Sequence, residues 1–114
     1  DTVGAWWLLA SQLTATATWH MPYIGGSATS PTASTSTTSG VAATAAESDL
    51  ARIEIDPNGT ARWYMNGVLK QTVEGAVSTT TLLAAYVGCW GTTTTAASVD
   101  VDYLLVRANR DWTR

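Results

Sequence analysis

The sequence predicts an all-β protein built as an antiparallel two-sheet β-sandwich. Several short segments alternate apolar and polar residues with a period of two, and no segment repeats apolar residues at helical spacing. Two tight-turn sequences, Asp56-Pro57-Asn58-Gly59 and Asn66-Gly67, separate three of these segments. Phe is absent, six Trp and four Tyr carry the aromatic mass, and Thr and Ser are abundant. This composition is typical of β-structure with a neutral, hydroxyl-rich surface.

Length and charge limit the classes of protein to consider. At 114 residues the chain is one domain, at the small end for a two-sheet sandwich. A net charge of −3 argues against a nucleic-acid partner, because nucleic-acid binding needs clustered Lys and Arg. No run of about 18 apolar residues is present, so no membrane-spanning helix and no membrane partner are predicted. The chain begins at Asp1 without an initiator Met, and we expect it to be a piece of a longer polypeptide.

Two strands are predicted near the N-terminus. Val3–Ala10 is a short apolar run consistent with a buried strand. Its adjacent Trp6 and Trp7 point to opposite faces, so one enters the core and the other needs a second layer, a neighbouring chain or a ligand as cover. Leu13–Trp19 alternates cleanly, and Pro22 ends that strand because proline cannot donate to a ladder.

Residues 25–49 form a low-complexity Ser/Thr/Gly/Ala segment. The composition is that of a flexible linker, although a structureless loop of this length is unusual inside a compact domain. Within it, small residues alternate with hydroxyl residues, which favours a polar strand. We predict a strand near Thr32–Val41 with a loop on each side.

The central segment Leu50–Val73 reads as three antiparallel strands joined by two turns. The first turn suits a three-residue loop that closes with a bulge at Gly59 and pairs Asp56 with Thr60. Counting outward from this pair places Ile55 beside Ala61. It also places Ile53 beside Trp63 on the same face.

The second turn has two interpretations. A two-residue type I′ turn at Asn66-Gly67 sets Trp63 opposite Lys70, whereas a three-residue loop Met65–Gly67 sets Trp63 opposite Leu69. We adopt the three-residue loop. The predicted core face then consists of Ile53, Ile55, Ala61, Trp63, Leu69 and Val73.

Two further strands are predicted after the central segment, Leu82–Trp90 and Ser98–Val106, with a turn of small residues at Thr92–Ala97. Cys89 falls on the apolar face of its strand and is predicted to be buried. The sandwich domain therefore covers residues 1–106. Residues 107–114 form a C-terminal arm around Trp112.

From about Leu50 onward, the segments ARIEID, PNGTARWYMNGVL, YVGCW and SVDVDYLLV resemble the C-terminal half of a concanavalin A-like lectin/glucanase jelly roll. The form is most similar to domains of bacteriophage virion proteins such as capsid decoration, fibre and spike proteins. The resemblance implies a jelly roll that is incomplete in this chain and presents unpaired sheet edges. It also implies a place on the particle surface, with other virion subunits and further copies of the chain as partners.

The sequence offers little for catalysis or metal binding. The glucanase branch of the resembling family uses a Glu-x-Asp-x-x-Glu run, which this sequence lacks. Asp100 and Asp102 share a strand face without a partner Glu, and charge pairs on a solvated face explain them. His20 has no nucleophile context and is interpreted as structural. Turn chemistry explains Asp56-Pro57-Asn58-Gly59, so no metal and no cofactor are predicted.

The candidate ligand or interface residues are the aromatic side chains expected at the surface and their polar neighbours. They are Trp6, Trp7, Arg62, Tyr64, Trp90, Asp102 and Trp112. Sugar binding and subunit interfaces both use such residues, and the expected unpaired edges favour an interface. We therefore predict a non-enzymatic structural or adhesion domain of a bacteriophage virion protein. The alternative is a carbohydrate-binding, lectin-like module with a host-surface glycan as partner, and a more remote one is a glycoside hydrolase fragment.

Overall fold

The computed structural model describes residues 3–10, 18–44, 47–89, 91 and 98–108. The chain divides into two units, residues 1–83 and residues 84–114. Among the described residues, all seven strands lie in the first unit and no α-helix is present. The predicted all-β class is therefore confirmed. The strands are β1 Gly4–Ala5, β2 Thr18–His20, β3 Tyr23–Ile24, β4 Thr38–Ala42, β5 Ala51–Ile55, β6 Ala61–Met65 and β7 Val68–Val73.

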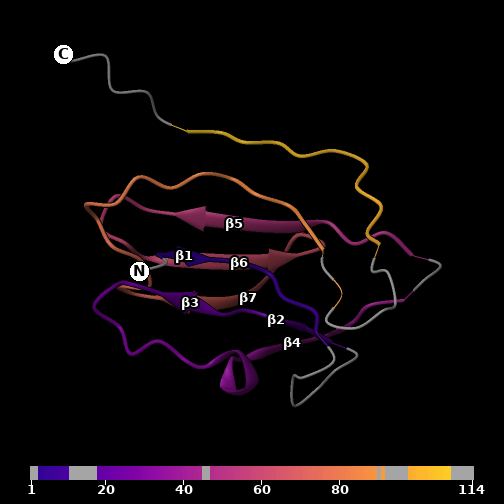
Figure 1. The fold of residues 1–114 in the computed structure, drawn as a ribbon, viewed down its shortest axis with the longest axis horizontal. Helices are drawn as coiled ribbons and strands as arrows, with labels where there is room; N and C mark the ends of the chain where they lie inside the picture. Colours follow the sequence, from indigo (N-terminus) through magenta and orange to yellow (C-terminus); the bar gives the residue numbers. More distant parts are fainter. Residues whose placement is uncertain (1–2, 11–17, 45–46, 90, 92–97, 109–114) are drawn as a thin grey trace. The chain divides into compact units, whose positions relative to one another are not determined.

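The strands form three small antiparallel sheets (Figure 1). The largest is the meander β5-β6-β7, and the other two are the pairs β1-β3 and β2-β4. An isolated bridge between Leu8 and His20, together with a hydrogen bond from the Trp6 amide to the Pro22 carbonyl, links the two pairs. The N-terminal segment thus runs antiparallel to residues 20–24 along most of its length.

The first turn of the meander has the predicted register. Ile55 pairs with Ala61 and Ile53 pairs with Trp63. The Asp56 amide donates to the Thr60 carbonyl at 2.9 Å, which closes the loop. Gly59 takes a φ of 83°, a conformation that glycine adopts without steric cost.

The predicted three-residue loop at the second turn is wrong. Asn66 and Gly67 have φ values of 52° and 81°, and Met65 pairs directly with Val68 across a two-residue loop. Positive φ at both central residues is the signature of a type I′ turn, whose twist matches that of the flanking strands. Met65 is consequently a buried strand residue.

A bulge in β7 follows this turn. Tyr64 pairs with Leu69, but the next residue of β6, Trp63, pairs with Gln71, so Lys70 is the extra residue. The two-residue turn pairs Leu69 with the outward-facing Tyr64, so Leu69 is 50% exposed and the prediction that it is buried is wrong. Val73, beyond the bulge, returns to the core face.

The core lies between the meander and the N-terminal strands. Trp63 is fully buried at its centre, and its ring centroid lies 6.1 Å from that of Tyr23. The other buried members are Met21, Ala61, Ala76 and Val77, and the partly buried residues packed against them are Val3, Ala5, Trp7, Tyr23, Ile53 and Val73. Because two sheets supply these side chains, the first unit is sandwich-like. Ile55, predicted in the core, is 40% exposed because it ends β5.

The N-terminal segment follows the predicted alternation over a shorter strand. Only Gly4–Ala5 is a strand, followed by the bridge at Leu8, rather than all of Val3–Ala10. Trp7 packs against the core. The Trp6 ring lies 3.4 Å from the place that a Cβ on Gly4 would take, which is the side of the segment opposite to Ala5 and Trp7. Residues 13–17 of the predicted strand Leu13–Trp19 lie outside the described part of the chain, and its last two residues, Thr18 and Trp19, begin β2. As predicted, β2 ends before Pro22.

The low-complexity segment contains one strand that is shorter than predicted. A 3-10 turn at Ala33–Thr35 occupies the first part of the predicted strand Thr32–Val41, and β4 begins at Thr38. The turn forms because the hydroxyl-rich sequence bonds to its own backbone: the Thr35 amide and hydroxyl both donate to the Thr32 carbonyl.

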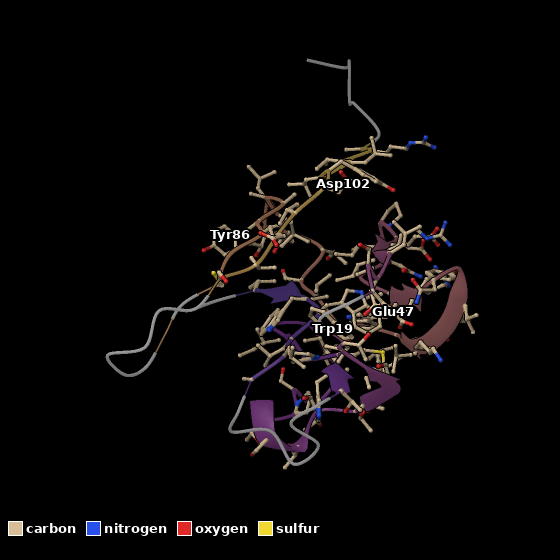
Figure 2. The ribbon with its side chains drawn as sticks, turned by 90° about the vertical axis from the view of Figure 1, so that its right-hand side faces the viewer. Trp19, Glu47, Tyr86 and Asp102 are labelled. Carbon is tan, nitrogen blue, oxygen red and sulfur yellow. The ribbon has the colours of Figure 1, made fainter. Side chains whose placement is uncertain are left out.

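The two predicted C-terminal strands, Leu82–Trp90 and Ser98–Val106, are wrong over the described residues. Residues 82–89 and 98–106 have no regular secondary structure, although their sequences alternate. Figure 2 shows Tyr86 and Asp102 on this arrowless part of the ribbon. A strand needs a neighbour for its backbone hydrogen bonds, and no described strand pairs with either segment. Trp90 and residues 92–97 lie outside the described part.

Candidate functional site

The outer face of the β5–β6 hairpin gathers five polar or aromatic side chains that we call the outer platform. They alternate with the core-facing residues of the same two strands and therefore point away from Trp63. Arg52 lies opposite Tyr64 and Glu54 lies opposite Arg62, so the strand register alone brings them together. The members are Arg52, Glu54, Asp56, Arg62 and Tyr64.

Arg52 covers one face of the Tyr64 ring. Its guanidinium carbon lies 4.0 Å from the ring centroid, which is close enough for a cation–π interaction. A guanidinium nitrogen of Arg52 also lies 3.5 Å from a carboxylate oxygen of Glu54. Tyr64 therefore presents only its other face and its hydroxyl to a ligand or partner.

Arg62 and Asp56 form the tightest ion pair on the platform. Nη1 of Arg62 donates to Oδ2 of Asp56 at 2.7 Å. This hydrogen bond, together with the negative charge of Asp56, raises the pKa of Arg62 above its usual value. The two arginines and two carboxylates balance in charge. The platform is thus a neutral surface of hydrogen-bonding groups around one aromatic ring.

The candidate residues predicted from the sequence fall in different places. Arg62 and Tyr64 lie together on the outer platform. Trp6 and Trp7 are half-buried: the Trp7 indole donates to the Arg52 carbonyl at 3.3 Å, and the Trp6 carbonyl accepts from the Trp63 indole at 3.0 Å. Both tryptophans thus help to join the two layers of the core.

The remaining candidates belong to the C-terminal unit. Asp102 is exposed. Trp90 and Trp112 lie outside the described residues.

The side chains of the turn Asp56–Gly59 are occupied by local bonds. Oδ1 of Asn58 accepts from the Thr60 amide at 3.0 Å, and Asp56 binds Arg62. In the part of the chain that the structure describes, no group of three or more His, Cys, Asp or Glu residues could hold a metal ion. The bonds to the Thr60 amide and to Arg62 engage the side-chain oxygens of Asn58 and Asp56 within the hairpin.

A shallow, open and polar depression lies where three loops of the first unit meet. The Ala28 amide donates to the Gly75 carbonyl and the Val77 amide donates to the Gly59 carbonyl, which draws the loops together. A Cβ at Gly26 would collide with the Gly75 carbonyl, so the backbones touch there. The depression is lined by Ser27, Ala28, Asn58, Thr60, Glu74 and Gly75.

His20 is buried and bonded to Ser36. Its Nδ1 lies 3.0 Å from the Ser36 carbonyl oxygen and 3.2 Å from the Ser36 hydroxyl. These contacts tie β2 to the segment before β4 and support the structural interpretation of His20. Cys89, by contrast, is exposed. The prediction that it is buried is wrong because its segment forms no strand and so has no apolar face to bury.

Sequence reasoning missed a hydrogen-bond network centred on Asp49. The Trp19 indole donates to Oδ2 of Asp49 at 3.0 Å, and the Asn66 side-chain amide donates to Oδ1 at 3.0 Å. Oδ1 of Asn66 accepts in turn from the Leu50 amide at 2.8 Å. Trp19, labelled in Figure 2, is thereby tied to the second turn of the meander. Only the turn sequence Asn66-Gly67 gave any signal of this network.

Within the described residues, no helix is long and apolar enough to cross a membrane. No family model matches this chain, and no significant match was found among curated proteins or among solved structures.

Proposed function

We propose that this chain is a non-enzymatic assembly domain, acting as a structural or adhesion part of a bacteriophage virion protein of the capsid decoration or fibre type. The observation that carries the proposal is the exposure of apolar side chains in the C-terminal unit. Eight described residues of this unit are large, apolar and exposed: Tyr86, Val87, Val99, Val101, Tyr103, Leu104, Leu105 and Val106.

Exposure of this kind is costly for a chain on its own. Fully burying one such side chain contributes about 1.5–3 kcal/mol, so covering several of them supplies enough free energy to hold subunits together. Monomeric proteins rarely expose contiguous apolar patches of more than a few hundred Å². Association with other subunits is the direct way to cover these side chains.

The surface of the first unit also supports association. Only 13% of the residues of the whole chain are charged, and the charges of the outer platform in the first unit are paired with one another. The arginine that lies on a tyrosine ring fits a subunit interface, because Tyr and Arg are enriched there and charged residues are depleted from the interface core. The virion setting rests on the resemblance of the segments after Leu50 to jelly-roll domains of phage particles.

The virion part of the proposal is tested by immunoelectron microscopy on particles released from the cells that encode the chain. We expect antibodies against the chain to label the particle surface at regular positions. Particles without label, when the same antibodies detect the chain elsewhere in the lysate, would contradict a place on the virion.

A carbohydrate-binding module is the second candidate, because Arg62 and Tyr64 stand side by side on the outer platform. Arg52 occupies one face of the Tyr64 ring, so a sugar would have to stack on the other. A glycan array distinguishes the two functions. Binding that Tyr64→Ala abolishes, by a chain that stays monomeric, would place sugar recognition first.

A further inference from the structure

Of the two edge strands of the meander, β5 is the one without a bulge and is therefore the better place for another strand to pair. The order β5-β6-β7 leaves β5 and β7 outermost among the described strands. The bulge at Lys70 interrupts β7, and bulges and lysines are devices that protect an edge from pairing. β5 pairs with β6 from Ala51 to Ile55 without any register shift, and it contains no proline or glycine.

The hydrogen bonds of β5 show which of its peptide groups face the open edge. The Asn66 amide donates to the Leu50 carbonyl, and the Asp56 amide donates to the Thr60 carbonyl. Hydrogen-bonded positions alternate along an antiparallel strand, so the even-numbered residues from 50 to 56 face β6. The peptide groups of Ala51, Ile53 and Ile55 therefore point outward, in position to bond another strand.

Ser98–Val106 has the pattern of a strand that has not found its partner. Its sequence alternates, and its residues Val99, Val101, Tyr103 and Leu105 would share one face. These four side chains are between 47% and 62% exposed, and the segment has no regular structure. A single chain thus leaves both the apolar face and the backbone of this segment without a strand neighbour among the described residues.

Charge selects one register for adding this segment to β5. Arg52 and Glu54 point to the outer face of β5, with side chains 55% and 43% exposed. In an antiparallel pairing, Asp102 opposite Arg52 would force Asp100 opposite Glu54, where like charges repel. Asp100 opposite Arg52 avoids this conflict. It places Asp102 opposite Leu50, which carries no charge.

We propose that Ser98–Val106 of one copy adds as an antiparallel strand to β5 of a second copy, with Asp100 opposite Arg52. This inference rests on the proposed assembly function: the partner is a second copy of the chain, and the contact is the pairing of Ser98–Val106 with β5. In this register Val99 lies beside Ile53 and Val101 lies beside Ala51. The apolar face of the added strand then continues the core face of the meander, and every described strand pair in the first unit is likewise antiparallel.

Cysteine pairs in a Cys89→Ser background test the contact directly. One chain carries Ala51→Cys and the other carries Val101→Cys, and both native residues are exposed, so neither change disturbs the core. Directly opposite residues in a hydrogen-bonded pair lie about 5.5 Å apart at Cα, within the range that a disulfide spans. Under mild oxidation we expect the mixed chains to form a disulfide-linked heterodimer that reductant dissolves. Its yield should be at least about 10-fold higher than the yield of disulfide-linked homodimer from either chain alone.

A shifted pair is the matched control. Mixing Ala51→Cys with Val99→Cys separates the thiols by two residues, and we expect little crosslinking because diagonal partners lie about 7–8 Å apart. Equal yields from the two pairs would overturn the register. If a double variant with Ala51→Cys and Val101→Cys forms its disulfide within one chain, Ser98–Val106 pairs with β5 of its own chain, and the proposed pairing with a second copy is wrong. If the chain is oligomeric but forms no crosslink, the contact between Ser98–Val106 and β5 is wrong and the proposed assembly function remains. If the chain is monomeric in every experiment, both the contact and the assembly function are wrong.

Charge reversal gives an independent readout. Arg52→Glu sets like charges opposite each other in the proposed register, and we expect the dissociation constant of the assembly to rise at least about 10-fold. Adding Asp100→Arg restores the pair with reversed polarity and should recover most of the affinity. Failure of the double variant to recover, when its circular dichroism matches that of the native chain, would contradict the pairing of these two residues.

Discussion

The indole nitrogen of Trp63 donates a hydrogen bond to the carbonyl oxygen of Trp6 at 3.0 Å, which joins the two layers of the sandwich-like core. Trp63 is fully buried, and residues of both layers surround it. A buried N–H without a partner would cost about 1–3 kcal/mol, so this bond fixes how the N-terminal segment lies on the meander.

Trp63→Phe tests that relationship. The change removes the indole N–H, leaves the Trp6 carbonyl without its donor and opens a small cavity, so we expect a loss of about 1–3 kcal/mol in the free energy of unfolding. Urea denaturation followed by circular dichroism at one protein concentration measures it. Val68→Thr, at a well-exposed position of β7, is the control and should change stability by less than about 0.5 kcal/mol. Equal effects of the two changes would contradict the central role of Trp63.

Two glycines with positive φ should respond differently to alanine. Gly67 has a φ of 81° and open space where a Cβ would lie, so Gly67→Ala carries only the backbone cost of about 1–2 kcal/mol. At Gly59 the same Cβ would also collide with the Val77 carbonyl, and overpacking adds about 1–3 kcal/mol. Thermal or urea unfolding of both variants gives the ranking. A Gly59→Ala variant as stable as Gly67→Ala would show that the Val77 loop is not held where the structure has it.

The Asp49 network makes a prediction about a residue that has no sequence motif. Asp49→Ala removes the acceptor of both Trp19 and Asn66, and we expect a loss of about 1–3 kcal/mol in the free energy of unfolding. Glu47→Ala is the matched control because Glu47 is exposed and its carboxylate accepts a local bond from the Thr44 hydroxyl, three residues away. We expect the control to lie within about 0.5 kcal/mol of the native chain. An Asp49→Ala variant that matches the control would mean that the network adds nothing to stability.

The two faces of Ser98–Val106 should differ in assembly. Val101→Asp places a charge on the apolar face of the proposed added strand, and we expect the assembly to weaken at least about 10-fold because a buried, unpaired charge is costly. Leu104→Asp is the control on the opposite face, beside Asp102, and should change the affinity by less than about threefold. Sedimentation velocity at a series of concentrations measures both. Equal weakening would mean that the segment does not associate as a strand.

The sequence predicted the first turn of the meander correctly because Pro57 and Gly59 are compatible with a single turn type and therefore with a single strand register. The second turn was mispredicted for a physical reason. A type I′ turn and a bulge at Lys70 each shift the pairing by one residue in the same direction, so beyond the bulge the register differs by two residues from the predicted one. Because side chains alternate with a period of two, a shift of two residues returns them to their predicted faces. Alternation therefore placed Val73 correctly and misplaced Leu69, which lies between the two shifts.

Part of the outer platform could be predicted, since the period of two places Arg62 and Tyr64 on one face of β6. The position of Arg52 over the Tyr64 ring could not, because it depends on the rotamer of a long side chain. The bond between Trp19 and Asp49 joins residues from separate segments, and no local pattern records it. The C-terminal segments alternate like strands, but alternation alone does not say which chain supplies the neighbouring strand.

The native mass of the full chain in solution, measured by light scattering at several concentrations, bears most directly on assembly. We expect a defined oligomer whose mass is constant over the upper part of the concentration range, because other copies cover the exposed apolar face formed by Val99, Val101, Tyr103 and Leu105. A chain that remains monomeric at every concentration, with the fold of the first unit intact by circular dichroism, would contradict assembly through these side chains.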